Sequence, residues 1–142
     1  MKLIVLTLLY LVIIEYSRIV LVIVVWRIAL FIDCNLSYKD RPDLNATANV
    51  NFECVFVELI GVPQKNKIVG SIYRPPDSNL DLFMFDFESV LTILNKTKSE
   101  CLLAGDYNIN LLKHEVNDGT RNFVNCLYDI SLIPLITRPT FW

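Results

Sequence analysis

Hydrophobic positions dominate the beginning of the chain, whereas shorter apolar runs alternate with polar segments over the rest. Residues 3–26 contain seventeen Leu, Ile and Val residues and two charged ones, Glu15 and Arg18. Membrane insertion is permitted but not compelled, because these aliphatic side chains contribute about −5 to −10 kcal/mol and the two charges cost about 5–7 kcal/mol. The many Ile and Val residues also suit strands. Three interpretations stay open: a transmembrane helix, an uncleaved signal-like segment, or buried strands.

The remaining pattern predicts strands that alternate with helices, as in an α/β fold. Apolar stretches predict strands at residues 28–32, 52–60, 67–74, 100–105 and 131–136. An amphipathic helix that ends near Lys96 is predicted by five regularly spaced apolar residues: Phe83, Phe87, Val90, Leu91 and Leu94. Thr120 is expected to cap a second, short helix, and residues 37–50 to form a loop or a sheet edge. We expect residues 1–27 to be a separate hydrophobic segment, in which residues 3–26 form one continuous apolar element.

The strand, helix and strand between Lys67 and Asp106 form a β-α-β unit. If the two strands are parallel, their carboxyl ends lie at one edge of the sheet, where ligands of open α/β sheets bind. One of these ends carries Tyr73 and Arg74, and the other carries Asp106 and Asn108. The topology therefore predicts that these polar side chains meet.

The residue types at these strand ends suit phosphate chemistry. An aspartate such as Asp106 can hold a metal ion or orient a water nucleophile, and the Asn108 amide can donate to a phosphate oxygen. The phenol of Tyr73 and the guanidinium of Arg74 suit phosphate contacts as well. Each motif also has a structural interpretation, because Gly-Asp-x-Asn is good turn chemistry and a tyrosine can pack at a sheet edge. Taken alone, Gly-Asp-Tyr-Asn favours the turn.

Three short motifs occur in order along the chain. They are Tyr-Arg-Pro-Pro at 73–76, Gly-Asp-Tyr-Asn at 105–108 and Leu-Ile-Thr-Arg-Pro-Thr at 135–140. This set resembles the endonuclease/exonuclease/phosphatase domain of non-LTR retrotransposons, which typically reads Y-R-P-P, G-D-F-N and L-I-x-x-P-T. The resemblance covers residues 28–142. It implies an α/β fold that is a partial two-sheet sandwich of the DNase I-like type.

The resemblance also implies a function. The family hydrolyses DNA phosphodiesters with a divalent metal, usually Mg²⁺, so DNA is the implied partner. By motif, Asp106 would position or activate the attacking water, and Tyr73 would contact the scissile phosphate. Asn108 would hold a phosphate oxygen or, with Asp106, assist the metal site. We add Arg74 as a further contact to the phosphate backbone.

Several parts of the family pattern are missing from this sequence. The pattern begins with a strand that ends in asparagine and a later metal-binding glutamate, and it ends with an aspartate and a Ser-Asp-His motif. The first 27 residues carry neither early residue, and the sequence reaches Trp142 before the late ones. His114 lies too close to the Gly-Asp-Tyr-Asn motif to be the missing histidine. We therefore expect a fragment with little or no nuclease activity.

Composition leaves two other functions open. The net charge of −2 gives no basic footprint for nucleic acid, although an enzyme that meets DNA at one cleft need not show one. A DNA-binding module without cleavage is one alternative, and a membrane-anchored, non-catalytic protein is another. Localisation accordingly stays open between nucleus, cytoplasm and membrane. The four cysteines form no Cys-x-x-Cys pair, so we expect reduced thiols rather than a zinc site.

Overall fold

The structure, a computed structural model, describes residues 2–6, 11–14, 19–25, 27–62, 64–113 and 115–135. Six strands of these residues form one sheet: β1 (Lys2–Leu6), β5 (Tyr38–Asp40), β6 (Glu53–Leu59), β7 (Lys67–Tyr73), β8 (Glu100–Asp106) and β9 (Leu132–Pro134). Three more form a second sheet: β2 (Leu11–Ile14), β3 (Ile19–Val25) and β4 (Ile28–Asp33). The helices are α1 (Pro42–Asn45), α2 (Leu80–Lys96) and α3 (Asp118–Asp129), with a 3-10 turn at Leu111–Lys113.

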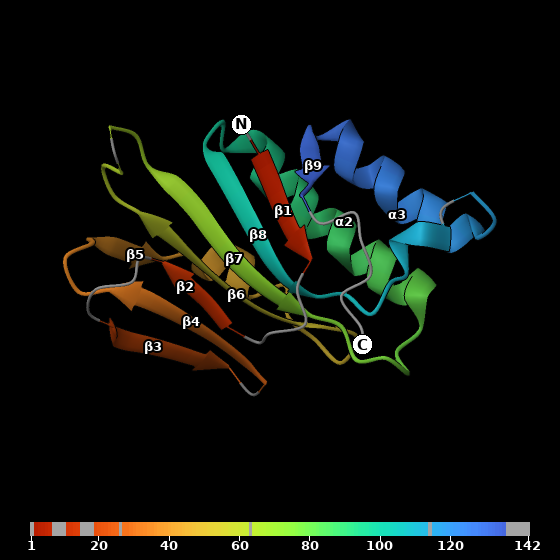
Figure 1. The fold of residues 1–142 in the computed structure, drawn as a ribbon, viewed down its shortest axis with the longest axis horizontal. Coiled ribbons are helices and arrows are strands. Elements are labelled where there is room, and N and C mark those ends of the chain that lie inside the picture. The colour runs from red at the N-terminus through yellow and green to blue at the C-terminus, as the bar shows by residue number, and fades with distance from the viewer. Residues whose placement is uncertain are drawn as a thin grey trace.

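The described elements stack in layers, with helices on one face of the larger sheet and the smaller sheet on the other (Figure 1). The larger sheet has the order β5-β6-β7-β8-β1-β9, and the smaller one has the order β2-β4-β3. The pairs β7–β8, β8–β1 and β1–β9 are parallel, whereas β5–β6 and β6–β7 are antiparallel. The predicted mixed α/β fold and the parallel β7–β8 pair are confirmed.

The hydrophobic beginning of the chain is divided into three strands. β1 pairs in parallel with both β8 and β9, while β2 and β3 flank β4. The prediction of one continuous element is therefore wrong, because the Ile- and Val-rich sequence is extended and finds backbone partners in other strands. β4 pairs with β2 and β3, which precede the boundary predicted at residue 27, and that division of the chain stays a prediction. Among the described residues, no helix has the length and apolar character needed to cross a membrane.

Two apolar cores lie on opposite faces of the larger sheet. The inter-sheet core joins residues of β4, β6, β7 and β8: Ile28, Leu30, Ile32, Val55, Val57, Leu59, Val69, Tyr73 and Ala104. Successive side chains of a strand point to opposite faces. In β7, Ile68 and Ile72 consequently belong to the helix-side core, whereas Val69 and Tyr73 belong to the inter-sheet core.

The helix-side core is rich in aromatic rings. The predicted apolar face of α2 is buried against the sheet, and the helix ends at Lys96 as predicted. Phe83 and Phe87 stack at 5.2 Å between centroids, and Phe87 lies 5.8 Å from Phe123 of α3.

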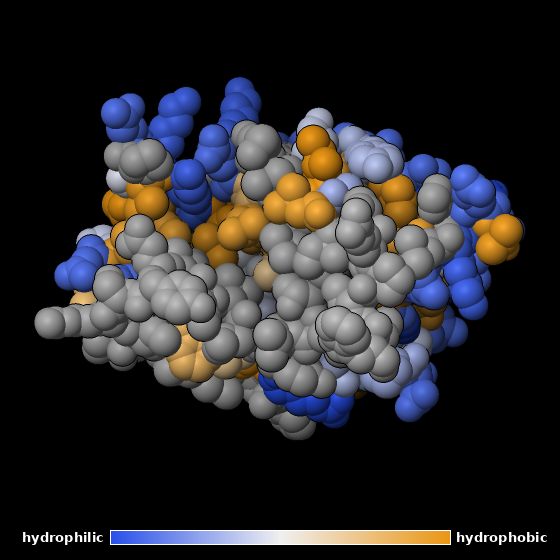
Figure 2. Space-filling view, viewed as in Figure 1, coloured by the Kyte–Doolittle hydropathy of each residue, from blue (hydrophilic) through white to orange (hydrophobic). Residues whose placement is uncertain are grey.

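Hydrophilic side chains cover the right-hand side of the view in Figure 2, where the outer surface of α3 lies.

The caps of the helices depend on asparagine. The Asn79 side chain accepts the N–H groups of Asp81 and Leu82 at the start of α2. At α3 the cap is Asn117, whose side chain accepts the Thr120 N–H at 2.9 Å. The prediction that Thr120 caps α3 is wrong because Thr120 already lies inside the first turn, where its N–H needs an acceptor.

Candidate functional site

The predicted site residues lie at one end of the larger sheet. Tyr73 pairs with Asp106 across the parallel β7–β8 ladder, which confirms that the two positions share one edge. Glu53 pairs with Tyr73 on the other side, so the three residues form a row across β6, β7 and β8. Alternation along each strand places all three on the inter-sheet face.

The Tyr-Arg-Pro-Pro and Gly-Asp-Tyr-Asn motifs are hydrogen-bonded to each other. The Arg74 backbone N–H donates to the Asp106 carbonyl at 2.8 Å, continuing the ladder by one step. The Asn108 side-chain amide donates to the Arg74 carbonyl at 2.6 Å, and Arg74 Nη2 donates back to the Asn108 carbonyl at 2.7 Å. Because each motif satisfies the other's backbone, the two loops form one structural unit.

Arg74 is the buried cross-link of this unit. Its side chain donates from Nε to the Tyr107 carbonyl and from Nη1 to the carbonyl and hydroxyl of Ser78. The guanidinium also lies 5.9 Å from the centre of the Phe83 ring. Burial lowers the pKa of Arg74, and the charge of Asp106 opposes this shift. These contacts give Arg74 a structural role, and its contact with a DNA phosphate stays a prediction.

The Gly-Asp-Tyr-Asn motif forms the tight turn that its sequence favoured. Asp106 Oδ1 accepts the Asn108 N–H at 3.0 Å, and Asn108 has a φ of 49°, which asparagine tolerates better than most residues. Gly105 has a φ of 143°, and a Cβ there would collide with the Ile72 carbonyl oxygen. The turn leaves Asp106 half-buried at the end of β8. The structural and chemical interpretations of the motif are therefore compatible.

Arg27 and Glu53 belong to the same sheet end and were missed in the sequence. Glu53 accepts the Arg27 backbone N–H at 2.9 Å, and its other carboxylate oxygen lies 3.6 Å from Arg27 Nε. Arg27 Nη1 lies 3.4 Å from the Tyr73 hydroxyl, with the guanidinium 5.3 Å from the ring centre. The sequence did contain a signal for Glu53. Because side chains alternate between the two faces of a strand, Glu53 lies on the same face of β6 as the buried Val55.

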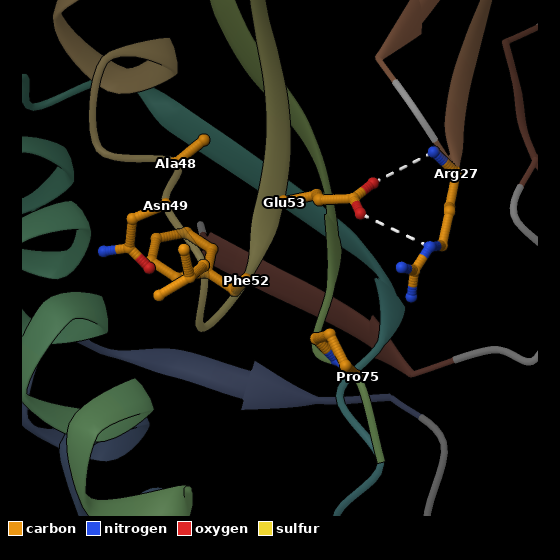
Figure 3. A pocket seen from close by; sticks show the side chains of 7 residues that line it. Arg27, Ala48, Asn49, Phe52, Glu53 and Pro75 are labelled. Atoms are coloured by element: carbon orange, nitrogen blue, oxygen red, sulfur yellow. Dashed lines mark hydrogen bonds and ion pairs between the residues drawn. The ribbon is translucent and has the colours of Figure 1, made fainter. Parts of the chain in front are cut away.

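A cavity of about 480 Å³ opens beside this cluster. Its lining residues come from the β3–β4 turn, the segment before β6, the start of β6 and the loop after β7: Arg27, Ala48, Asn49, Val50, Phe52, Glu53 and Pro75 (Figure 3). The lining is mostly apolar, and Arg27 and Glu53 are its charged members. In Figure 3 the Glu53 carboxylate faces Arg27, and dashed lines join it to the backbone nitrogen and Nε of that residue.

Asp106 and Asn108 are the predicted magnesium ligands. Magnesium requires near-octahedral oxygen coordination, usually with one or two carboxylates and several waters. Asp106 supplies a carboxylate and Asn108 an amide oxygen, but no group of three or more His, Cys, Asp or Glu within the described ranges could hold a metal. Glu15 and residues 136–140 of the third motif lie outside those ranges. Magnesium binding stays a prediction.

Comparison with solved structures found a similar fold. The chain resembles the endonuclease domain of TRAS1, a telomere-specific non-LTR retrotransposon, with a TM-score of 0.52 and 16% sequence identity. The match covers 80% of this chain and 52% of that one, so the chain spans about half the length of its structural relative. No protein-family model and no curated protein matches the sequence. At this identity, the likeness shows a shared fold.

Proposed function

We propose that the chain is part of a DNA endonuclease domain, and that the sheet end at Tyr73, Asp106 and Asn108 binds the phosphate backbone of DNA. The observation that carries this proposal is the mutual hydrogen bonding of the two motifs, which brings Tyr73 and Asp106 into register. If Gly-Asp-Tyr-Asn were only a turn, it would not need hydrogen bonds to Arg74 of the other motif, 34 positions earlier in the chain. The shared fold with a retrotransposon endonuclease domain supports the same assignment.

Each residue has a distinct role in this proposal. The Tyr73 hydroxyl donates a hydrogen bond to a phosphate oxygen, and Asp106 orients the attacking water. Asn108 holds the phosphate through its side-chain amide. Arg74 stabilises the loops after β7 and β8 through its buried hydrogen bonds. Removing one electrostatic stabiliser typically costs about 2.7–4 kcal/mol in the transition state. Because no group of three or more metal-ligating side chains includes Asp106 in the described residues, we propose that the chain binds DNA but cuts it at a rate near background.

Binding can be tested with two substitutions whose expected effects have opposite signs. We expect Tyr73→Phe to weaken binding of a duplex oligonucleotide roughly two- to tenfold, because one hydrogen bond is lost. Without metal, we expect Asp106→Asn to tighten binding about fivefold, because a charge about 4 Å from a phosphate repels it by about 1 kcal/mol in water. Asp129→Asn, at an exposed position that ends α3, is the matched control and should change little. Fluorescence anisotropy in low salt with a chelator measures all three.

The outcomes separate the proposal from its rivals. Loss of folding would weaken both site variants, so opposite shifts support a phosphate site at this sheet end. Equal affinity in all four proteins, or no DNA binding by the unaltered chain, would refute it. A plasmid-nicking assay with magnesium then tests the expected low activity. Robust nicking that Asp106→Asn abolishes would retain the endonuclease assignment and overturn only the expected inactivity.

A further inference from the structure

Lysine residues gather at the end of the larger sheet that lies opposite Tyr73 and Asp106. They come from the β6–β7 turn, the start of β7, the last turn of α2 and the loop between α2 and β8: Lys65, Lys67, Lys96 and Lys98. Lys67 pairs with Glu100 across the parallel β7–β8 ladder, so these segments meet where both strands begin. Figure 2 shows hydrophilic side chains projecting at this end of the molecule, which we call the lysine end.

The positive charge of the lysine end is only partly neutralised. Lys67 Nζ lies 3.1 Å from the Glu100 carboxylate, and Lys67 most strongly, with Lys65 less so, lowers the pKa of that carboxyl. The other three lysines are exposed and form no ion pair within the described part of the chain. Besides Glu100, Asp129 lines one groove with Lys96. A net positive charge therefore remains at this end, although the whole chain carries −2.

Two of these lysines sit on ordered turns. The Lys65 carbonyl accepts the Val62 N–H at 3.0 Å within the β6–β7 turn. Lys98 follows the end of α2 with a φ of 53°, in the left-handed region that glycine and asparagine adopt most readily. A lysine there has a backbone cost that glycine would not have, so the position combines local strain with a charge. The dipole of α2 favours a cation near its C-terminus as well, so stability alone cannot identify a partner.

The composition of the lysine end favours a phosphate polymer over a protein as its partner. Residues 60–67 and 96–100 contain no arginine and no aromatic residue. Protein interfaces are enriched in those residue types and depleted in lysine. Clustered lysines are instead typical of surfaces that bind the nucleic-acid backbone, where duplex DNA presents one charge per roughly 1.7 Å.

We propose that the lysine end is a second DNA-binding surface, which contacts the phosphate backbone of a duplex without reading its sequence. β7 has seven residues, so this surface lies about 20 Å from Tyr73 at roughly 3.3 Å per residue. The two sheet ends therefore contact different phosphates. The inference goes beyond the proposed function, which concerns only the end that carries Tyr73 and Asp106.

The salt dependence of DNA binding tests this surface. Each neutralised phosphate adds about 0.9 to the slope of log Kd against log salt on duplex DNA. We expect the double variant Lys65→Gln/Lys98→Asn to lower that slope by about 1.8, so that the rise in Kd between roughly 50 mM and 200 mM salt becomes about twelvefold smaller. Asparagine suits the left-handed backbone at position 98, so folding should be preserved. Arg121→Gln is the control, because Arg121 is exposed but already pairs with Asp118 at 2.8 Å.

Glu100→Gln should have the opposite effect. It removes the carboxylate that pairs with Lys67, so we expect a steeper slope and tighter binding of the duplex. A labelled polyglutamate peptide is the comparison ligand. Peptide binding that depends on Lys65 and Lys98 as strongly as DNA binding does would assign the surface to acidic proteins and overturn the inference.

The two DNA proposals fail in different ways. A slope unchanged in the double lysine variant, in a protein whose binding still responds to Tyr73→Phe and Asp106→Asn, would overturn this inference alone. A slope that falls in the double variant, in a protein indifferent to Tyr73→Phe and Asp106→Asn, would support the lysine end and refute the proposed site. An unaltered chain that does not bind DNA would overturn both.

Discussion

Tyr107 places a hydroxyl group inside an apolar core. Its side chain is 2% exposed, and its ring lies 5.4 Å from Phe123 and 5.9 Å from Phe87. The hydroxyl oxygen is buried and has no hydrogen-bond partner among the described residues. Leaving a buried polar group unsatisfied costs about 1–3 kcal/mol. The related motif has phenylalanine at this position, so this chain carries a cost that the motif itself does not require.

The substitution Tyr107→Phe should therefore stabilise the protein. The ring contacts remain, and the lost oxygen leaves a void of about 10 Å³, which costs only about 0.2 kcal/mol at roughly 24 cal/mol per Å³. The expected net gain in the free energy of unfolding is about 1–2 kcal/mol. Tyr128→Phe is the control, because that tyrosine is 57% exposed on α3 and its hydroxyl is not buried.

The same hydroxyl predicts a pH dependence. Burial raises the pKa of Tyr107 above its ordinary value of 10.0, so the unfolded chain ionises first as the pH rises. The free energy of unfolding is unaffected by this ionisation below about pH 10. Above that pH it falls by about 1.4 kcal/mol per pH unit, because only the unfolded chain loses the Tyr107 proton. Urea unfolding followed at neutral pH and above pH 10 measures both effects. An equal or lower midpoint for Tyr107→Phe at neutral pH would refute the reasoning, since it would mean that the hydroxyl has a partner in solution.

Three further predictions concern the motif loops and the thiols. Gly105→Ala should lower the free energy of unfolding by at least about 3 kcal/mol, because the new Cβ would collide with the Ile72 backbone and because φ is positive. Gly61→Ala is the control: its φ is also positive but the space around it is open, so it should cost about 1 kcal/mol. Arg74→Lys should destabilise the protein by about 2–4 kcal/mol in urea unfolding, because lysine cannot reproduce the bonds that join the loops; an unchanged midpoint would contradict the cross-link. The exposed Cys34 should react with a thiol reagent in the native protein, whereas Cys54, whose thiol pKa burial raises, should react only on unfolding. Mass spectrometry of the labelled peptides distinguishes the two cysteines.

Local patterns predicted the elements whose signals lie within a single segment. The apolar spacing from Phe83 to Leu94 fixed the buried face of α2, and the strand-helix-strand order placed Tyr73 beside Asp106. The hydrophobic run at the start could not be assigned in this way. Hydropathy does not distinguish a membrane helix from Ile- and Val-rich strands, and the partners of β1 are β8 and β9, far along the chain.

The parts of the site that escaped prediction depend on contacts between distant segments. Glu53 reaches Tyr73 through the antiparallel register of β6 and β7, and Arg27 reaches both from the turn before β4. No local pattern encodes either register. The phosphate contact predicted for Arg74 rests on the guanidinium lying at a strand end, and it stays a prediction. The inward direction of the Arg74 side chain follows from backbone carbonyls that only the loop after β8 supplies.

The position of β1 between β8 and β9 has a consequence for biosynthesis. Lys2 pairs with Cys101, so β1 leaves the ribosome before either of its partner strands, β8 and β9, has been made. At about 5–20 residues per second, the β1 sequence waits about 5–20 s before β8 follows it. An apolar strand with unpaired backbone groups can pair with other nascent chains during that time. The yield of soluble protein should therefore depend on translation rate and on chaperones that hold the early segment, as well as on the stability of the finished fold.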